Sequence, residues 1–232
     1  RRAHMIRNIL FDLDDTLLDF HRAEKIAVGR ALGEMGVDPT EETLRRYSEI
    51  NAEHWRMLER GELTREQVLA YRFRALFREL WKDPELAGET AEKYENYLCI
   101  GHYFMPGAEA ALEALYGDFR LYIVSNGTAK VQESRMLSSG IGRYFEDVFI
   151  SQNTGFNKPE AGFFDYCFRR IPDFCREETV IIGDSLTSDI KGGINAGIRT
   201  VWLNPESRDS GDIKPDYQVR DLDEFVKLVR EI

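Results

Sequence analysis

The sequence predicts an α/β fold: a doubly wound, Rossmann-like parallel sheet with an inserted all-helical domain. Three observations support this prediction. An apolar run at residues 9–11 leads directly into Asp12, helical periodicity without a strand pattern fills residues 20–101, and short apolar runs then alternate with helical segments. Strands that alternate with helices are typical of parallel βαβ units with right-handed crossovers.

The first strand is expected at about residues 6–11, and the motif D-L-D-D-T follows at positions 12–16. Open α/β sheets bind ligands beyond the carboxyl ends of their strands. Asp12 and Asp14 would repel each other there, and a bound cation is the usual remedy. A solvated turn is the simpler interpretation of such an acidic segment. A calcium loop is excluded, because its sixth and twelfth positions need Gly and Glu, whereas the chain has Leu17 and Ala23.

Residues 20–101 are expected to form a separate helical unit. Its first helix carries small apolar residues on one face, and Thr40 is expected to begin the second helix. Thr64 and Gln67 form a plausible capping box for the third helix, and the fourth is expected at about residues 84–98.

The second half of the chain is expected to complete the parallel sheet. Apolar or β-branched runs predict strands, and 3.6-residue periodicity predicts the helices between them. The strands are expected at residues 121–124, 147–150, 179–182 and 200–203, and the helices at residues 108–115, 129–137, 161–170 and 188–196. We therefore assign residues 5–19 and 102–232 to the core and residues 20–101 to the insertion. Residues 1–4, which precede a Met, resemble a tag remnant.

Polar residues follow three of these strands, where a ligand would bind. Ser125 and Asn126 end one strand, Lys158 follows the next across a loop, and Asp184 ends a third. Asp189 lies near the start of the following helix. Alone, each is typical of a turn, a surface lysine or a helix cap. Their order, each behind an apolar strand, favours one common site.

Composition limits the partners and the compartment. The 232-residue chain is 43% hydrophobic and 31% charged, which suits a globular enzyme. Its formal net charge of -10 argues against a nucleic-acid polymer as partner. We see no membrane-length apolar segment and no signal peptide, so no membrane partner is expected. Three widely spaced cysteines without a C-x-x-C pair favour reduced thiols and a cytoplasmic location. We expect a monomer or a weak dimer.

Together these residues resemble the haloacid dehalogenase-like hydrolase superfamily. The resemblance rests on D-x-D-x-T at positions 12–16, Ser125, Lys158 and G-D-S-x-x-x-D at positions 183–189, in the family's order and spacing. It runs from Met5 to the C-terminus and places the helical insertion where the family carries its C1 cap. Softer similarities point to the bacterial pyrimidine 5′-nucleotidases: N-A-E-H-W at 51–55, E-R-G-E-L-T at 59–64, G-G-I-N-A-G at 192–197 and W-L-N at 202–204.

The resemblance implies a chemistry for the acids. Asp12 would attack phosphorus as a nucleophile and form an aspartyl phosphate. Asp14 would act as general acid towards the leaving alkoxide and then as general base for water. A divalent cation would reduce the repulsion between Asp12 and an anionic phosphate, and Mg²⁺ suits an oxygen-only site, with Mn²⁺ left open. The implied metal ligands are the carboxylates of Asp12 and Asp184 and the backbone carbonyl of Asp14.

The resemblance also implies supporting roles for other residues. The Ser125 hydroxyl, the Asn126 amide N–H and the Lys158 ammonium would hold the phosphoryl oxygens. Asp189 would orient Lys158 or a metal-bound water. Thr16 is expected to fix the first loop by hydrogen bonding rather than to react.

The implied function is a Mg²⁺-dependent phosphatase for a small phosphorylated metabolite, with a pyrimidine nucleoside 5′-monophosphate as the favoured substrate. A sugar-phosphate phosphatase or a β-phosphoglucomutase-like phosphotransferase remains an alternative, because it shares the cap type and the motifs. A 2-haloacid dehalogenase is disfavoured, since those enzymes use no metal and lack an acid at the position of Asp14. A non-enzymatic binding module is disfavoured because every catalytic group is retained.

Four residues of the helical insertion are candidates to contact the substrate: Phe20, Asn51, His54 and Trp55. Aromatic rings stack on nucleobases, and an Asn can hydrogen-bond a pyrimidine edge. The simpler interpretation is structural. Trp55 would then pack the interior of the insertion, and His54 would lie on its surface.

Overall fold

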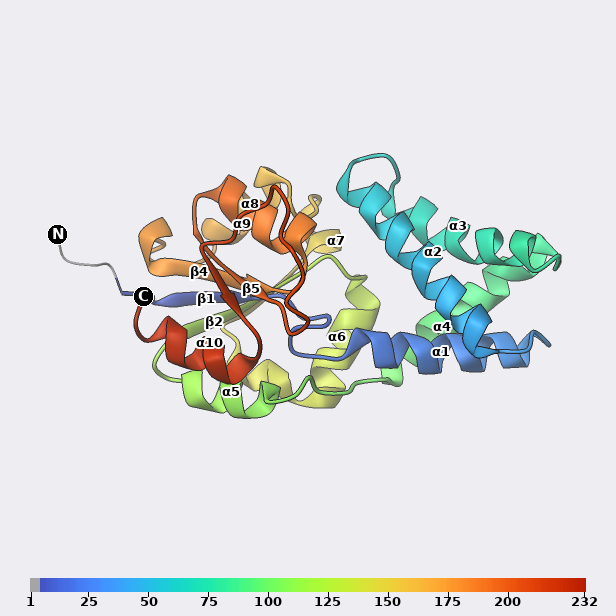
Figure 1. Cartoon of the computed structure of the whole chain (residues 1–232), viewed down its shortest axis with the longest axis horizontal. Coiled ribbons are helices and arrows are strands. Elements are labelled where there is room, and N and C mark those ends of the chain that lie inside the picture. Colours follow the sequence, from blue (N-terminus) through green and yellow to red (C-terminus); the bar gives the residue numbers. More distant parts are fainter. Residues whose placement is uncertain (1–4) are drawn as a thin grey trace. The chain divides into compact units, whose positions relative to one another are not determined.

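The computed structural model describes residues 5–232, which divide into two compact units (Figure 1). The α/β unit contains the chain up to Asp19 and from Tyr103 to Ile232, and the helical unit is Phe20–His102. His102 therefore falls in the helical unit, whereas the sequence placed it in the core. The expected tag remnant, residues 1–4, lies outside the described residues.

Within the described residues, the α/β unit has a six-stranded sheet in the order β3-β2-β1-β4-β5-β6, with every neighbouring pair parallel. The predicted doubly wound α/β fold is confirmed. The order reverses between β1 and β4, and such a switch point opens a crevice at the carboxyl ends of the strands. The strands are β1 (Asn8–Phe11), β2 (Arg120–Ser125), β3 (Asp147–Ile150), β4 (Thr179–Gly183), β5 (Arg199–Leu203) and β6 (Tyr217–Val219).

Helices cover both faces of this sheet, as Figure 1 shows. One face packs on α5 (Ala108–Leu115) and α10 (Leu222–Val229), and the other on α8 (Ala161–Phe168) and α9 (Lys191–Ala196). Side chains of a strand alternate between faces, so in β1 Ile9 and Phe11 join the first apolar cluster and Leu10 joins the second. The remaining helices of the unit are α6 (Ala129–Ser139) and α7 (Ser151–Thr154).

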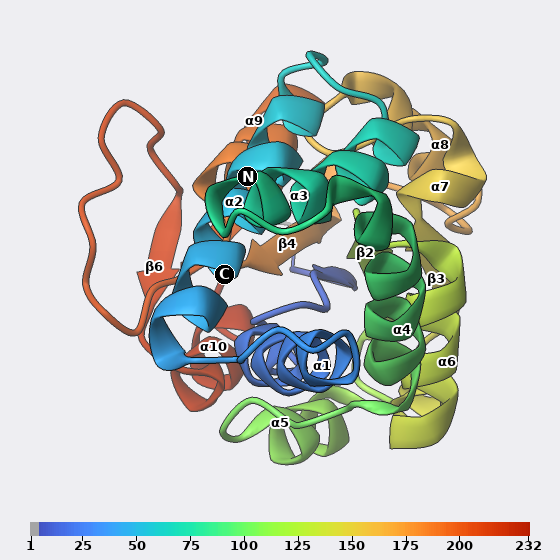
Figure 2. The same cartoon turned by 90° about the vertical axis from the view of Figure 1, so that its right-hand side faces the viewer.

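The helical unit consists of α1 (Phe20–Glu34), α2 (Glu41–Glu59), α3 (Arg65–Glu79) and α4 (Ala87–Ile100), which can be followed in Figure 2. The predicted helix starts are confirmed. Thr40 Oγ1 accepts from the backbone N–H of Thr43 at 3.1 Å. Thr64 and Gln67 form the reciprocal capping box, with hydrogen bonds of 2.8 and 3.2 Å. The fourth predicted helix begins as a 3₁₀ turn, Pro84–Leu86.

The structure differs from the sequence-based expectation near the C-terminus. The helix expected at residues 188–196 is a π-helical turn, Leu186–Ile190, followed by α9. The strand β6 and the helix α10 were not predicted. The strand is only three residues long and follows the extended loop that leaves β5, visible in Figure 2. The sequence signal for this helix is Asp221, since Asp is a favoured N-cap residue. Its carboxylate caps the helix by accepting from the backbone N–H of Glu224 at 2.8 Å.

Candidate active site

The first acidic motif forms a tight turn at the carboxyl end of β1. The backbone N–H of Asp12 still bonds to the carbonyl of Ile182 in β4, at 3.0 Å, so Asp12 is held at the edge of the sheet. The N–H groups of Leu17 and Leu18 then both donate to the carbonyl of Leu13, each at 3.0 Å. These backbone bonds fix the loop and fix where its acids point.

The expected hydrogen bond of Thr16 is not present among the described residues. Its Oγ1 is fully buried and has no hydrogen-bond partner there. The prediction that Thr16 fixes the loop by hydrogen bonding is therefore wrong. The backbone already satisfies the turn, and the Thr16 side chain lies in the apolar surroundings of Met105 and Leu203.

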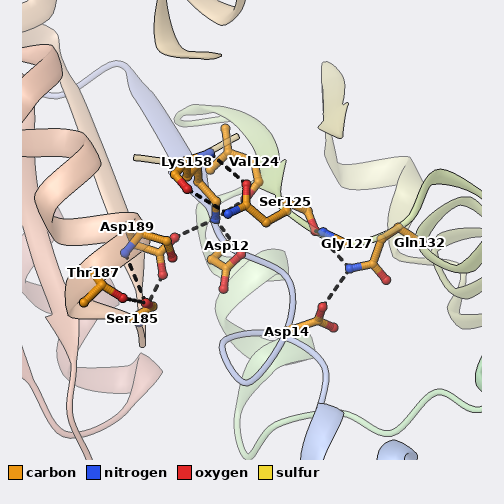
Figure 3. A network of polar contacts seen from close by, with 12 residues as sticks. Asp12, Asp14, Val124, Ser125, Gly127, Gln132, Lys158, Ser185, Thr187 and Asp189 are labelled. Atoms are coloured by element: carbon orange, nitrogen blue, oxygen red, sulfur yellow. Dashed lines mark hydrogen bonds and ion pairs between the residues drawn. The ribbon is translucent and has the colours of Figure 1, made fainter. Parts of the chain in front are cut away.

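Lys158 is the centre of a buried polar cluster (Figure 3). Its Nζ donates to Asp12 Oδ1 at 2.8 Å, to Asp189 Oδ1 at 2.6 Å and to the carbonyl of Val124 at 2.8 Å. These three acceptors use all three ammonium protons, although the side chain is only 1% exposed. Burial by itself would lower the pKa of Lys158, but the charges of Asp12 and Asp189 outweigh it and hold that pKa above its usual range.

Asn126 holds the backbone of Lys158. Its side-chain Nδ2 donates to the carbonyl of Lys158 at 2.9 Å, and its Oδ1 accepts from the N–H of Lys158 at 2.8 Å. The lysine segment is thus attached to the end of β2. The sequence assigned Asn126 a phosphate contact through its backbone, which stays a prediction. Its side chain has a positioning role that the sequence did not reveal.

The ends of β4 and β5 position the last two acids. The indole Nε1 of Trp202 donates to the backbone carbonyl of Asp184 at 2.9 Å. The backbone N–H of Ser185 donates to Asp189 Oδ2 at 3.1 Å. A Cβ at Gly183 would lie 2.1 Å from that same oxygen, so only glycine lets the Asp189 carboxylate approach the strand.

The carboxylate oxygens of Asp12, Asp184 and Asp189 lie within 4.8 Å of one another. Both oxygens of Asp189 already accept hydrogen bonds, so Asp12 and Asp184 are better placed to hold a cation. Burial raises the pKa of both, reinforced by the charge of Asp189 at Asp12 and by the charge of Asp12 at Asp184. A divalent cation would favour the ionised forms, and an oxygen-only donor set suits Mg²⁺. The residues present therefore fit the predicted metal.

Two residues of α6 that the sequence analysis did not single out complete the site. Gln132 Nε2 donates to Asp14 Oδ2 at 2.8 Å and to Ser125 Oγ at 2.9 Å. Arg135 forms an ion pair with Asp14, and both α6 side chains are buried. Two polar residues three apart on the helix face that also carries Val131 and Met136 were a sequence signal for this arrangement.

Asn51 is buried inside the helical unit. Its Nδ2 donates to Glu24 Oε2 at 2.6 Å, and its Oδ1 accepts from Arg72 at 3.0 Å. Only 2% of Asn51 is exposed. The structure gives this residue a part in holding three helices together, and its predicted contact with a substrate stays a prediction.

The other three candidates of the helical unit are partly exposed. His54 Nδ1 lies 2.8 Å from the carbonyl of Ile50, one turn earlier in α2. Trp55 lies under the guanidinium of Arg65, 5.6 Å from the ring centre. Phe20 is the first residue of α1. Their contact with a substrate likewise stays a prediction.

Comparisons with known proteins place this site in a family. The family model described as "Haloacid dehalogenase-like hydrolase" matches residues 9–203 of this chain. The chain is 41% identical to the HAD-hydrolase YfnB of Bacillus subtilis, over 96% of this chain and 95% of that protein. It is 37% identical to the pyrimidine 5′-nucleotidase PynA of Streptococcus pneumoniae, over 91% and 90%. It is 31% identical to the pyrimidine 5′-nucleotidase YjjG of Escherichia coli, over 95% and 96%.

The structural comparison agrees. A crystal structure of YfnB from Bacillus subtilis, described as bound to magnesium, superposes with a TM-score of 0.91 at 40% identity, over 97% of this chain and 99% of that one. Within residues 5–232, no helix has the length and apolar character that a membrane crossing requires. The family match spans most of the chain, and the predicted motifs meet at one edge of the sheet. The chain therefore belongs to the haloacid dehalogenase-like hydrolase family.

Proposed function

We propose that this protein is a Mg²⁺-dependent phosphatase that hydrolyses pyrimidine nucleoside 5′-monophosphates through an aspartyl-phosphate intermediate. One observation carries the proposal. The Asp12 carboxylate is held by the Lys158 ammonium next to Asp184, and Asp14 follows two residues later on the same turn. This arrangement supplies a nucleophile, a positive charge, a cation site and a proton-exchanging group together.

In the first half-reaction, a carboxylate oxygen of Asp12 attacks phosphorus and the bond to the leaving oxygen breaks. Asp14 gives that oxygen a proton. In the second half-reaction, water attacks the phosphorus of the aspartyl phosphate while Asp14 takes its proton, and Asp12 leaves as a carboxylate. Ser125 and the backbone N–H of Asn126 hold the phosphoryl oxygens throughout. The Lys158 ammonium joins them by exchanging one of its three present acceptors for a phosphoryl oxygen.

The carboxylates of Asp12 and Asp184 and the backbone carbonyl of Asp14 would hold Mg²⁺. When bound, the ion supplies positive charge that offsets the repulsion between Asp12 and the phosphate. The description of YfnB as bound to magnesium supports this choice of metal.

The relatives named pyrimidine 5′-nucleotidase support the substrate, since they are 37% and 31% identical over nearly the whole chain. An Asp14 side chain favours phosphoryl transfer over dehalogenation. An experiment can distinguish a phosphomutase from the proposed phosphatase, because the turnover of a mutase depends on a bisphosphate activator.

The test is a phosphate-release panel of pyrimidine and purine 5′-monophosphates, sugar phosphates and triose phosphates. We expect pyrimidine 5′-monophosphates among the best substrates, loss of turnover with EDTA, and recovery with Mg²⁺. The Asp12→Asn variant should lose on the order of a thousandfold or more in kcat while folding normally. The control, Asp118→Asn, changes an exposed acid and should turn over normally. Preference for a sugar phosphate over every nucleotide contradicts the substrate, and an active Asp12→Asn enzyme contradicts the mechanism.

A further inference from the structure

The side chains of Gln132 and Arg135 connect the phosphate-binding serine to the proton-exchanging acid. Both lie on α6, and they are 1% and 0% exposed. Gln132 Nε2 donates to Ser125 Oγ and to Asp14 Oδ2, contacts that Figure 3 marks with dashed lines. The steps of the proposed phosphatase reaction assign no role to either of these α6 side chains.

Arg135 determines which end of the Gln132 amide faces the site. A guanidinium can only donate hydrogen bonds, so the Gln132 atom 2.9 Å from Arg135 Nη1 must be the carbonyl oxygen Oε1. The amide nitrogen Nε2 therefore faces Ser125 and Asp14. Its two protons match the two acceptors, at 2.9 and 2.8 Å.

This fixed amide determines the direction of the Ser125 hydroxyl. Ser125 Oγ accepts from Gln132 Nε2 and from the backbone N–H of Gly127 at 3.1 Å. A hydroxyl oxygen has two lone pairs, and these two donors use them. The Ser125 proton is left to point at an acceptor outside this network, such as a phosphoryl oxygen.

The same network fixes the position of the Asp14 carboxylate. Its Oδ1 accepts from Arg135 and its Oδ2 from Gln132, so donors face both oxygens. These contacts fix the position of the carboxylate that has to accept a proton from water in the second half-reaction of the proposed phosphatase.

The local backbone is shaped around the amide. A Cβ at Gly127 would lie 2.4 Å from Gln132 Nε2, so a side chain there would displace the amide from Ser125 and Asp14. The close approach of Gln132 to the end of β2 thus depends on a glycine.

We propose that Gln132 and Arg135 are positioning residues that hold Asp14 as the proton acceptor for hydrolysis of the aspartyl phosphate and aim the Ser125 proton at the phosphoryl group. The proposal rests on the proposed phosphatase function. In the step concerned, a water oxygen bonds to phosphorus, the bond from phosphorus to Asp12 breaks, and the water proton passes to Asp14.

The test compares Gln132→Glu, Gln132→Met and Arg135→Lys in rapid-mixing assays with p-nitrophenyl phosphate. Its leaving group needs little protonation, so dephosphorylation should slow much more than phosphorylation of Asp12. We expect a burst of about one p-nitrophenol per site, then a steady state about tenfold or more below wild type. Gln132→Glu should be slower than Gln132→Met. The glutamate has nearly the shape of Gln132, but it places a carboxylate oxygen, which only accepts, against the acceptor oxygens of Asp14 and Ser125.

The control is Leu137→Ala, on the same helix but with a side chain that is 85% exposed, which should behave as wild type. If Arg135→Lys fails to fold, the two Gln132 variants still decide the question, with circular dichroism as the check on folding. Rates within twofold of wild type in folded Gln132 variants, or a slower rate without a burst, would overturn the inference. Wild-type enzyme without phosphatase activity would instead overturn the proposed function itself.

Discussion

Each unit of this protein buries a cluster of charged side chains, and the two clusters differ in their charge balance. The core cluster has Lys158 against the carboxylates of Asp12, Asp184 and Asp189, whose oxygens lie within 4.8 Å of one another. The helical-unit cluster has one acid and one cation, Glu24 and Arg72, linked through the amide of Asn51.

The difference in charge balance distinguishes a buried cluster suited to a reaction from one suited to packing. In the helical-unit cluster the formal charges cancel, so the cluster can hold helices together without help from solution. In the core cluster negative charge exceeds positive, and burial raises the pKa of the excess acids. That imbalance is costly unless a cation or a reaction uses it. Under the proposed function, the same types of side chain serve packing in one unit and chemistry in the other.

The largest expected effect comes from removing the cation of the core cluster. Lys158→Met leaves Asp12 and Asp189 buried without their partner, so we expect a loss of about 3–5 kcal/mol in the free energy of unfolding. Phosphatase turnover should also fall, on the order of a thousandfold. Urea unfolding and phosphate release measure both. Lys191→Met, at an exposed lysine of α9, is the matched control and should change neither. An unfolding free energy within 1 kcal/mol of wild type would remove the basis for the comparison.

A smaller and differently distributed effect is expected from Arg72→Met in the helical unit. Glu24 loses its counter-charge, but a single carboxyl group can take up a proton, so the loss should be about 2–3 kcal/mol. Hydrogen exchange should show the lost protection in residues 20–102. Turnover of p-nitrophenyl phosphate by the folded enzyme should stay within about twofold of wild type. Arg74→Met, at an exposed neighbour on α3, is the control. A large fall in turnover would mean that the helical-unit cluster also contributes to the reaction, which would contradict its purely structural role.

The smallest effect concerns the pH dependence of stability. Burial raises the pKa of Glu24, with the hydrogen bond from Asn51 and the charge of Arg72 opposing it only in part. The folded state then favours the protonated form, so stability is full below the unfolded-state pKa and declines as pH rises towards the folded-state value. Glu24→Gln cannot ionise, and its stability relative to wild type should increase as pH rises above about 4.5. Thermal unfolding from pH 4 to 8 measures this. Parallel curves for the two proteins would contradict the pKa argument.

Sequence patterns predicted the parts of the site that lie at strand ends. Apolar runs mark buried strands, and the first polar residues after them, such as Asp12, Ser125 and Asp184, must meet at one edge of a parallel sheet. The roles of these residues remain predictions, but their convergence is a consequence of the strand order. The capping of α2 and α3 was equally local and could be predicted from Thr40 and Thr64.

Contacts that depend on packing could not be predicted in this way. A Gln or an Arg in a helix is usually solvated, so only the shared helix face with Val131 and Met136 indicated that Gln132 and Arg135 are buried. That signal did not indicate which residues they contact. Thr16 had the chemistry for a hydrogen bond, but its surroundings in the folded chain are apolar. The strand β6 has too few residues to show alternation, and a polar residue occupies its middle.

The bond between the Asn126 side chain and the Lys158 backbone has a consequence for how this protein can change over evolutionary time. One amide pairs with the lysine peptide as an adjacent strand would, so the ammonium takes its location from β2 and not from the segment that precedes it in the chain. Insertions and deletions between Ile150 and Lys158 can then accumulate at little entropic cost, while the ammonium keeps its place.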